Sequence, residues 1–156
     1  MAALSSLTDT SKLGTSVCLL TQRNLFLVAR SIWSLQKVSG NRFIMGIAGG
    51  FIRKAMESHG ADFPERWNIV EESASIIKSQ WDGGSLGDPG VAQPPIWIGS
   101  NSKEVPKRVA RYADGWMTRK NLYPANAIED MREACAEIGR PFSSVTVALM
   151  DASLEV

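Results

Sequence analysis

A short polar segment, Gly99-Ser100-Asn101-Ser102, is the strongest candidate for chemistry in this sequence. It follows the apolar run Ile96-Trp97-Ile98 and precedes a helix-forming stretch that ends at Asp114-Gly115. Glycine allows a ligand to approach the backbone closely, and the exposed N–H groups at the start of a helix bind phosphate or carboxylate. The segment therefore predicts an anion-binding loop.

The same segment has a second interpretation, as an ordinary helix cap. Asn101 and Ser102 are residues that favour the N-cap position, and Asn101 with Glu104 resembles a capping box. Pro106 is expected in the first helical turn, where its missing N–H costs least. Capping and anion binding are compatible, so both interpretations stay open.

The other residues that catalysis commonly uses form no recognisable pattern. The sequence contains no apparent catalytic triad, no paired carboxylates and no Cys-x-x-Cys or His/Cys cluster, so no metal site is predicted. Cys18 and Cys135 are interpreted as buried thiols, because both lie among apolar neighbours. His59, the only histidine, is interpreted as a surface or turn residue. Catalytic residues are left unassigned.

Composition restricts the class of protein. The chain has 156 residues, 44% of them hydrophobic, which excludes intrinsic disorder and suits one domain. The net charge is +1 from 17 basic and 16 acidic residues, and no block of like charge is apparent, so nucleic acid and acidic membranes are not expected partners. No signal peptide or membrane span is recognised, which predicts a soluble cytoplasmic protein.

The periodicity of apolar residues predicts alternating strands and helices. The expected strands are 13–20, 43–48, 96–98, 115–118 and 144–150. Helices are expected over 24–37, 64–81, the stretch before Asp114, and 125–138. The predicted helix 24–37 carries the stripe Leu25, Val28, Ile32, Leu35, and the predicted helix 64–81 the stripe Trp67, Val70, Ala74, Ile77, Trp81.

Short apolar strands that alternate with helices are typical of a parallel sheet covered on both faces. The predicted fold class is therefore α/β. An open doubly wound sheet and a (β/α)8 barrel both satisfy this order of elements, and the pattern alone does not separate them.

Three stretches, taken in order, resemble the luciferase-like monooxygenase family, which includes bacterial luciferases, FMN-dependent monooxygenases and oxidoreductases that use the deazaflavin F420. They are LGTSVCLLTQRNLFLVARSIWSLQKVSGNRFIMGIAGGF at 13–51, ADFPERWNIVEESASIIKSQW at 61–81, and the PPIWIGSNS…ARYADGW stretch. The family's fold is a (β/α)8 barrel. The resemblance implies a partial barrel of about its third to seventh strands, with 1–156 as a single incomplete domain, since a whole barrel takes roughly 250 residues.

The resemblance also implies a cofactor, FMN or coenzyme F420, and the positions that would bind it. The family places the cofactor phosphate region against the 99–102 loop. In F420-dependent relatives a non-prolyl cis peptide supports the ring, and it maps here to Ser16-Val17. Small residues at the end of the next strand, among them Ala48 and Gly49, would let a flat ring approach. The implied cofactor-binding residues are Ser16, Val17, Ala48, Gly49, Gly99, Ser100, Asn101 and Ser102.

Two departures from the family limit this transfer. Gly49 stands where luciferases carry a phosphate-contacting arginine, and Phe51 stands where some F420-dependent dehydrogenases carry a catalytic glutamate. Neither the luciferase phosphate contact nor the dehydrogenase acid is carried over.

The favoured function is a flavin- or F420-dependent oxidoreductase or monooxygenase that acts on an unknown small organic substrate, with activity impaired if the chain is a fragment. The alternatives are a non-catalytic barrel fragment and another phosphate-binding (β/α)8 enzyme. A partial barrel has two open sheet edges, here the strands at 13–20 and 144–150. Such edges predict a homo-oligomer or an aggregation-prone chain.

Overall fold

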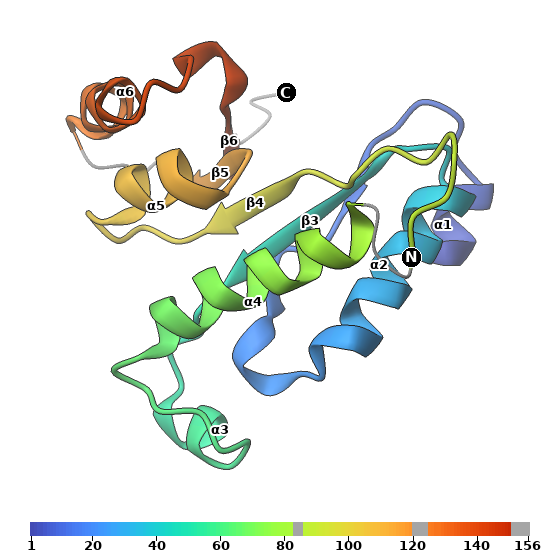
Figure 1. Ribbon diagram of the computed structural model, residues 1–156, viewed down its shortest axis with the longest axis horizontal. Helices are drawn as coiled ribbons and strands as arrows, with labels where there is room; N and C mark the ends of the chain where they lie inside the picture. Colours follow the sequence, from blue (N-terminus) through green and yellow to red (C-terminus); the bar gives the residue numbers. More distant parts are fainter. Residues whose placement is uncertain (83–85, 120–124, 151–156) are drawn as a thin grey trace, which may run out of the picture. The chain divides into compact units, whose positions relative to one another are not determined.

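The computed structural model describes residues 1–82, 86–119 and 125–150. Its internal contacts divide the chain into two compact units, Met1–Pro95 and Ile96–Val156 (Figure 1). We describe each unit by itself.

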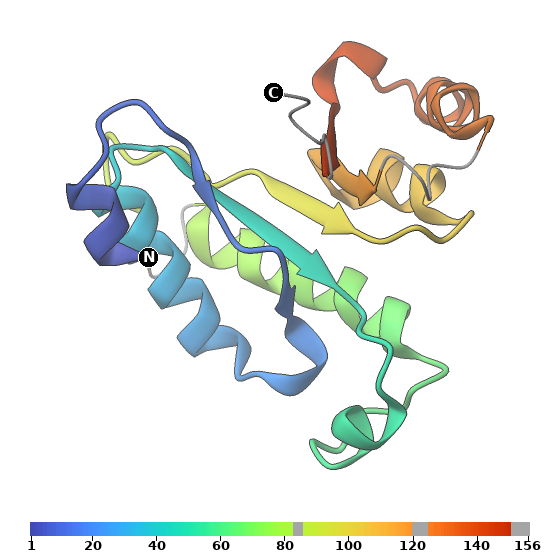
Figure 2. The same ribbon diagram turned by 180° about the vertical axis from the view of Figure 1, so that it is seen from behind.

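The first unit is built on the buried strand β3 (Phe43–Ala48). Two short strands, β1 (Leu13–Gly14) and β2 (Cys18–Leu19), both run parallel to it, as the view from behind shows (Figure 2). The helices are α1 (Ala2–Ser6), α2 (Leu25–Val38), α3 (Arg53–Glu57) and α4 (Arg66–Trp81), and a 3-10 turn covers Leu20–Gln22. The expected continuous strand over 13–20 is wrong, since two separate strands of two residues each replace it. The short helix α3 was not predicted.

Helices α2 and α4 lie side by side along β3, whose six residues are all buried (Figure 1). Between the helices the rings of Trp33 and Trp81 stack with centroids 6.3 Å apart, and the Trp81 indole N–H donates to the Ala29 carbonyl oxygen at 3.1 Å. The predicted stripe of α4 is confirmed at Val70, Ala74, Ile77 and Trp81, while Trp67 is half-buried.

The buried face of α2 differs from the predicted stripe. Ile32 is buried as expected, but Leu25, Val28 and Leu35 are only half-buried. The helix buries Ala29, Trp33 and Gln36 instead. Gln36 is tolerated there because its amide is satisfied: the oxygen accepts from the Phe43 N–H at 2.9 Å and the nitrogen donates to the Ala92 carbonyl oxygen at 2.9 Å.

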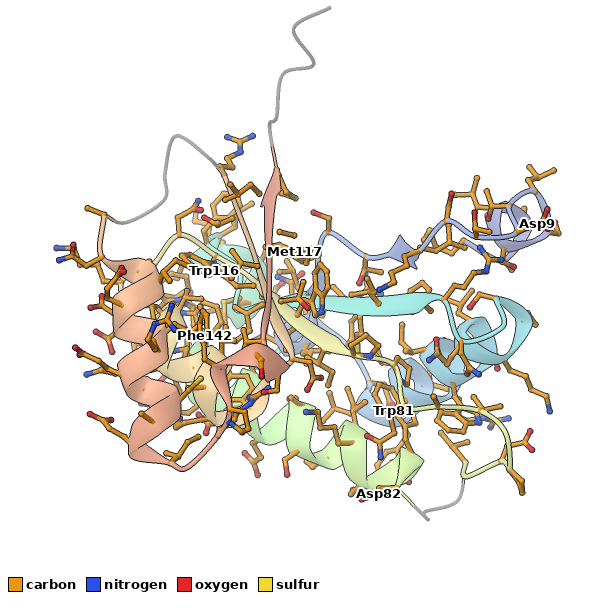
Figure 3. The ribbon with its side chains drawn as sticks, turned by 90° about the horizontal axis from the view of Figure 1, so that it is seen from above. Asp9, Trp81, Asp82, Trp116, Met117 and Phe142 are labelled. Atoms are coloured by element: carbon orange, nitrogen blue, oxygen red, sulfur yellow. The ribbon has the colours of Figure 1, made fainter. Side chains whose placement is uncertain are left out.

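The second unit contains three parallel strands, β4 (Ile96–Gly99), β5 (Gly115–Arg119) and β6 (Thr146–Met150), with β5 in the middle. Between them lie α5 (Val105–Tyr112), α6 (Ala127–Glu137) and a 3-10 turn at Phe142–Ser144. Figure 3 labels Trp116 and Met117 on β5. Trp116 and Cys135 are fully buried, which for Cys135 confirms the prediction.

Two features fix the packing of this unit. Gly115 touches its neighbours so closely that an added Cβ would lie 2.7 Å from the Trp97 indole and 2.8 Å from the Thr146 carbonyl oxygen. Arg140 binds the carboxyl end of α5, because its Nη1 donates to the carbonyl oxygens of Val109, Ala110 and Ala113 at 3.0, 2.9 and 2.8 Å.

Each unit therefore consists of parallel strands joined by helices, which confirms the α/β fold class and is the construction of a partial (β/α)8 barrel. Among the described residues, no helix combines the length and apolar character that crossing a bilayer requires.

Candidate cofactor site

The polar loop Gly99–Ser102 is held at the carboxyl end of β4 by side chains of β5. The Trp116 indole N–H donates to the Ser100 carbonyl oxygen at 2.7 Å, and the Thr118 hydroxyl donates to the Asn101 Oδ1 at 2.9 Å. Thr118 is only 1% exposed and Trp116 is fully buried, so both donors are rigid supports. Neither Trp116 nor Thr118 was predicted to support the loop. Thr118 lies near the end of β5, the strand beside β4, and the carboxyl ends of neighbouring parallel strands meet at one edge of the sheet. That position was the signal in the sequence that could have identified Thr118.

The helix cap predicted at Asn101 and Ser102 is wrong. Helix α5 begins at Val105, its N-cap residue is Glu104, and no side chain caps it. The two serine hydroxyls instead bond to backbone N–H groups ahead of the helix. The Ser100 hydroxyl accepts from the Ser102 N–H at 3.2 Å, and the Ser102 hydroxyl accepts from the Glu104 N–H at 3.3 Å. The backbone N–H of Ser102 in the loop and that of Glu104 at the N-cap are therefore occupied. Pro106 lies in the first helical turn as predicted.

This loop still suits an anionic group, through side chains more than through backbone N–H groups. A hydroxyl that accepts a hydrogen bond keeps its own hydrogen to donate, so Ser100 and Ser102 each remain donors. Asn101 is exposed, and the hydrogen bond from Thr118 to its Oδ1 fixes the orientation of the whole side-chain amide, Nδ2 included. Lys103 and Lys107 are exposed just beyond the loop, but they share a groove with four carboxylates, those of Glu104, Asp130, Glu133 and Glu137, which offset their charge.

In the first unit, two of the predicted cofactor-binding residues, Ala48 and Gly49, lie at the carboxyl end of β3. Ala48 is 8% exposed. A Cβ on Gly49 would meet the Arg66 side chain at 3.2 Å and the Trp67 indole at 3.4 Å, so glycine lets the first turn of α4 lie directly against the strand end. Gly50 has φ of +77°, a conformation that glycine adopts without penalty.

Two arginines that were not predicted as site residues lie beyond this strand end. The guanidinium carbons of Arg53 and Arg66 lie 4.6 and 4.2 Å from the centroid of the Phe63 ring. Arg66 also donates to the Phe63 carbonyl oxygen at 2.9 Å, and Arg53 pairs with Glu57 at 3.2 Å. The side chain of Arg66 therefore places a cation beside the end of β3, while the charge of Arg53 is paired.

Ser16 and Val17, also predicted to bind the cofactor, lie between β1 and β2 of the first unit. The peptide bond is cis, as the resemblance implied. The strand register pairs Leu19 with Ala48, and the Thr15 hydroxyl donates to the Gly46 carbonyl oxygen at 2.8 Å. The structure therefore brings Ser16 and Val17 alongside the middle of β3, two to three residues before the paired Leu19–Ala48 position.

Val17 also lines a groove between the short strands and α2. Its volume is about 510 Å³, and it is lined by Thr15, Val17, Cys18, Gln22, Arg23, Asn24, Leu27, Val28, Ser31 and Ile32. Cys18 is half-buried rather than buried, which corrects the prediction. Burial raises the pKa of the Cys18 thiol, and the nearby Arg23 guanidinium opposes that rise.

His59 is exposed in the turn after α3, where its Nδ1 lies 2.8 Å from the Ala55 carbonyl oxygen, so the predicted surface or turn role is confirmed. Across the described parts of the chain, no three His, Cys, Asp or Glu side chains are grouped to hold a metal ion.

Comparison with known proteins identifies the family to which these features belong. The family model for luciferase-like monooxygenases matches residues 1–152. The chain belongs to this family. An uncharacterised protein of Mycobacterium tuberculosis is 26% identical to it over 161 residues, which cover 90% of the chain and 57% of the relative. The chain thus spans little more than half the length of that relative.

Solved structures show the same fold as this member of the luciferase-like family. An F420-dependent secondary alcohol dehydrogenase, in complex with an F420-acetone adduct, superimposes with a TM-score of 0.78 at 18% identity, over 96% of this chain and 52% of the dehydrogenase. The oxygenating constituent of 3,6-diketocamphane monooxygenase from Pseudomonas putida, in complex with FMN, superimposes with a TM-score of 0.71 at 20% identity. The match covers 94% of this chain and 49% of the monooxygenase chain. Both comparisons support the predicted partial barrel.

Proposed function

We propose that this luciferase-like chain binds FMN or coenzyme F420 and contributes to an oxidoreductase or monooxygenase reaction on a small organic substrate. The observation that carries the proposal is the Gly99–Ser102 loop of a chain of this family, in which Trp116 holds the Ser100 carbonyl oxygen and Thr118 holds the Asn101 side-chain amide. Relatives of the same fold contain F420 or FMN, which supports the choice of cofactor.

The proposed division of labour follows from the chemistry of the residues. The cofactor supplies hydride transfer or oxygen activation, and the protein supplies binding and orientation. The hydroxyls of Ser100 and Ser102 would donate to its phosphate. In the first unit, Ser16, Val17 and Ala48 are the proposed contacts of a flat ring, whereas Arg66 and Trp67 occupy the space beside Gly49.

Arg66 is the best placed cation for a second anionic contact in the first unit. Its stem lies against Gly49, and its guanidinium is positioned by the Phe63 ring and carbonyl oxygen. The hydrogen bond to the Phe63 carbonyl oxygen uses one of the five guanidinium N–H donors. No described side chain is assigned as a proton donor or nucleophile, so the substrate and the catalytic residues are left open.

Binding of the cofactor is tested by titrating the purified chain with FMN and with F420 and following absorbance or fluorescence. A carboxylate about 4 Å from a phosphate charge costs about 4 kcal/mol at an effective dielectric constant near 20. We therefore expect Ser100→Asp to weaken binding by at least about tenfold. Ser143→Asp, which adds the same charge at an exposed site of the second unit, is the matched control and should bind like the parent.

A second pair of variants tests the support of the loop. Thr118→Val removes the buried hydroxyl that donates to Asn101 but keeps its shape, whereas Thr118→Ser keeps the hydroxyl. We expect weaker binding in the valine variant only. Equal affinities of the parent, Ser100→Asp and Ser143→Asp would remove this loop from the site. Binding of neither cofactor would instead favour the non-catalytic fragment.

A further inference from the structure

The sheet of the second unit has two unlike faces. Ile98 of β4 and both Trp116 and Thr118 of β5 are at most 1% exposed, and α5 packs against these two strands. Ile98 is the register partner of Trp116, so these three side chains share one face. Because successive side chains of a strand point to opposite faces, Gly99 and Arg119 lie on the other face. Arg119, the last residue of β5, is exposed.

The strand register also brings Arg119 beside the Gly99–Ser102 loop. Gly99 is paired with Met117, so two residues further along both chains Asn101 lies next to Arg119. The Arg119 N–H donates to the Asn101 Oδ1 at 3.5 Å, and the same oxygen accepts from the Thr118 hydroxyl at 2.9 Å. The backbone of Arg119 is therefore held against the loop, and its guanidinium is the nearest addition of positive charge from the neighbouring strand.

The position of Arg119 distinguishes it from the two lysines beyond the loop. Lys103 and Lys107 share their groove with four carboxylates, of which three belong to α6 and one is the N-cap residue of α5. Arg119 instead stands at a strand end, on the face of the sheet that carries Gly99. Asp114 precedes the other end of β5, about 16 Å away along an extended strand.

We propose that Arg119 is the cationic contact of the phosphate ester for which the Gly99–Ser102 loop is the candidate site. The inference rests on the proposed function, because it takes the phosphate of FMN or F420 as the ligand. A guanidinium can bind two phosphate oxygens through parallel N–H donors, so Arg119 adds charge and direction to the neutral hydroxyl donors of Ser100 and Ser102. Gly99 has no side chain on the shared face, which leaves its backbone open to the ligand from that side. All of these phosphate contacts belong to the second unit.

The test separates the phosphate from the ring. FMN and riboflavin have the same ring system and only FMN has a phosphate, so each is titrated into the purified chain and followed by flavin fluorescence. We expect Arg119→Met to weaken FMN binding by about tenfold to a hundredfold, as for the loss of a hydrogen bond between charged groups, and to leave riboflavin binding within about twofold. Arg119→Lys keeps the charge without the planar donors and should lie between the parent and the methionine variant.

Two further measurements distinguish phosphate binding from a structural effect. Arg132→Met removes an exposed cation from α6 and is the matched control, which should bind both flavins like the parent. Salt screens the attraction between Arg119 and phosphate, so the FMN affinity of the parent should fall more steeply with sodium chloride than that of Arg119→Met. If the parent binds F420 and not FMN, the same variants and the same salt series are measured with F420, and the same loss is expected.

Failure of this inference is distinguishable from failure of the proposed function. A parent that binds FMN or F420, with Arg119→Met binding equally well, refutes the role of Arg119 and leaves the proposed function standing. Equal losses of FMN and riboflavin binding in Arg119→Met also refute it, because the effect would then not depend on the phosphate. A parent that binds neither cofactor refutes the proposed function and this inference with it.

Discussion

Arg140 offers a sharp test of the packing of the second unit. Replacement by methionine keeps most of the aliphatic stem but removes the donors to three carbonyl oxygens at the end of α5 and to the Ser144 hydroxyl at 2.9 Å. The last carbonyl groups of a helix have no partner within the helix, and a hydrogen bond to a charged donor contributes about 1.5–3 kcal/mol. The three carbonyl bonds share one nitrogen and do not add fully.

We therefore expect Arg140→Met to lower the free energy of unfolding by about 2–3 kcal/mol. With a urea m-value of about 1–3 kcal/mol per molar, the unfolding midpoint should fall by roughly 1 M or more. Because the chain has two compact units, hydrogen–deuterium exchange of α5 peptides should accompany the urea titration, and α5 should lose protection first.

Two variants serve as controls. Arg140→Lys keeps the charge but not the planar set of donors, so its cost should be intermediate. Arg132→Met removes another cation, one that stacks 4.5 Å from the Phe142 ring centroid, and should cost about 1 kcal/mol or less. If Arg140→Met unfolds within 0.5 kcal/mol of the parent, or costs no more than Arg132→Met, the proposed role of Arg140 at the helix end is refuted.

Two further variants follow from the same contacts. Gly115→Ala should cost about 3 kcal/mol or more in thermal unfolding, because a Cβ would lie 2.8 Å from a backbone oxygen; Gly139→Ala, with φ of +69° and no atom within 4 Å, is the control and should cost about 1 kcal/mol. In a Cys135→Ser background, thiol labelling of Cys18 should rise with pH at a midpoint above that of the urea-unfolded chain, because burial raises the pKa of this thiol. Arg23→Gln removes the charge that stabilises the thiolate and should move that midpoint further up; a midpoint at or below the unfolded value would contradict this reasoning.

Long apolar runs and regular helical stripes made most of the fold predictable. The strands at Phe43–Ala48 and Gly115–Arg119 and the buried stripe of α4 were found because each has a strong period or a continuous apolar run. Helix α3 has only Met56 buried, so five residues gave no periodic signal. The segment 13–20 has the β-forming residues expected of a strand. Composition does not determine how many of those residues pair with a neighbouring strand, and here only four do.

The position of the Gly99–Ser102 loop, between β4 and α5, was predictable from the sequence, but its contacts were not. The loop was chosen as a candidate because small polar residues after a buried strand are unusual. Its hydrogen bonds were missed, since Trp116 and Thr118 reach it from another strand, and no local pattern records which strands are neighbours.

The crowding around Gly115 constrains how this sequence can change over evolutionary time. A bulky partner such as Trp97 can be replaced by a smaller residue, and a steric conflict with it can then be relieved by a compensating substitution. The Thr146 carbonyl oxygen belongs to the backbone, so no substitution at position 146 removes it. A side chain at position 115 would therefore clash with the backbone whatever residue stands at position 146, whereas a smaller residue at position 97 creates no such clash. In an alignment of sequences that keep β5 between β4 and β6, glycine should be invariant at 115 while the residue at 97 varies.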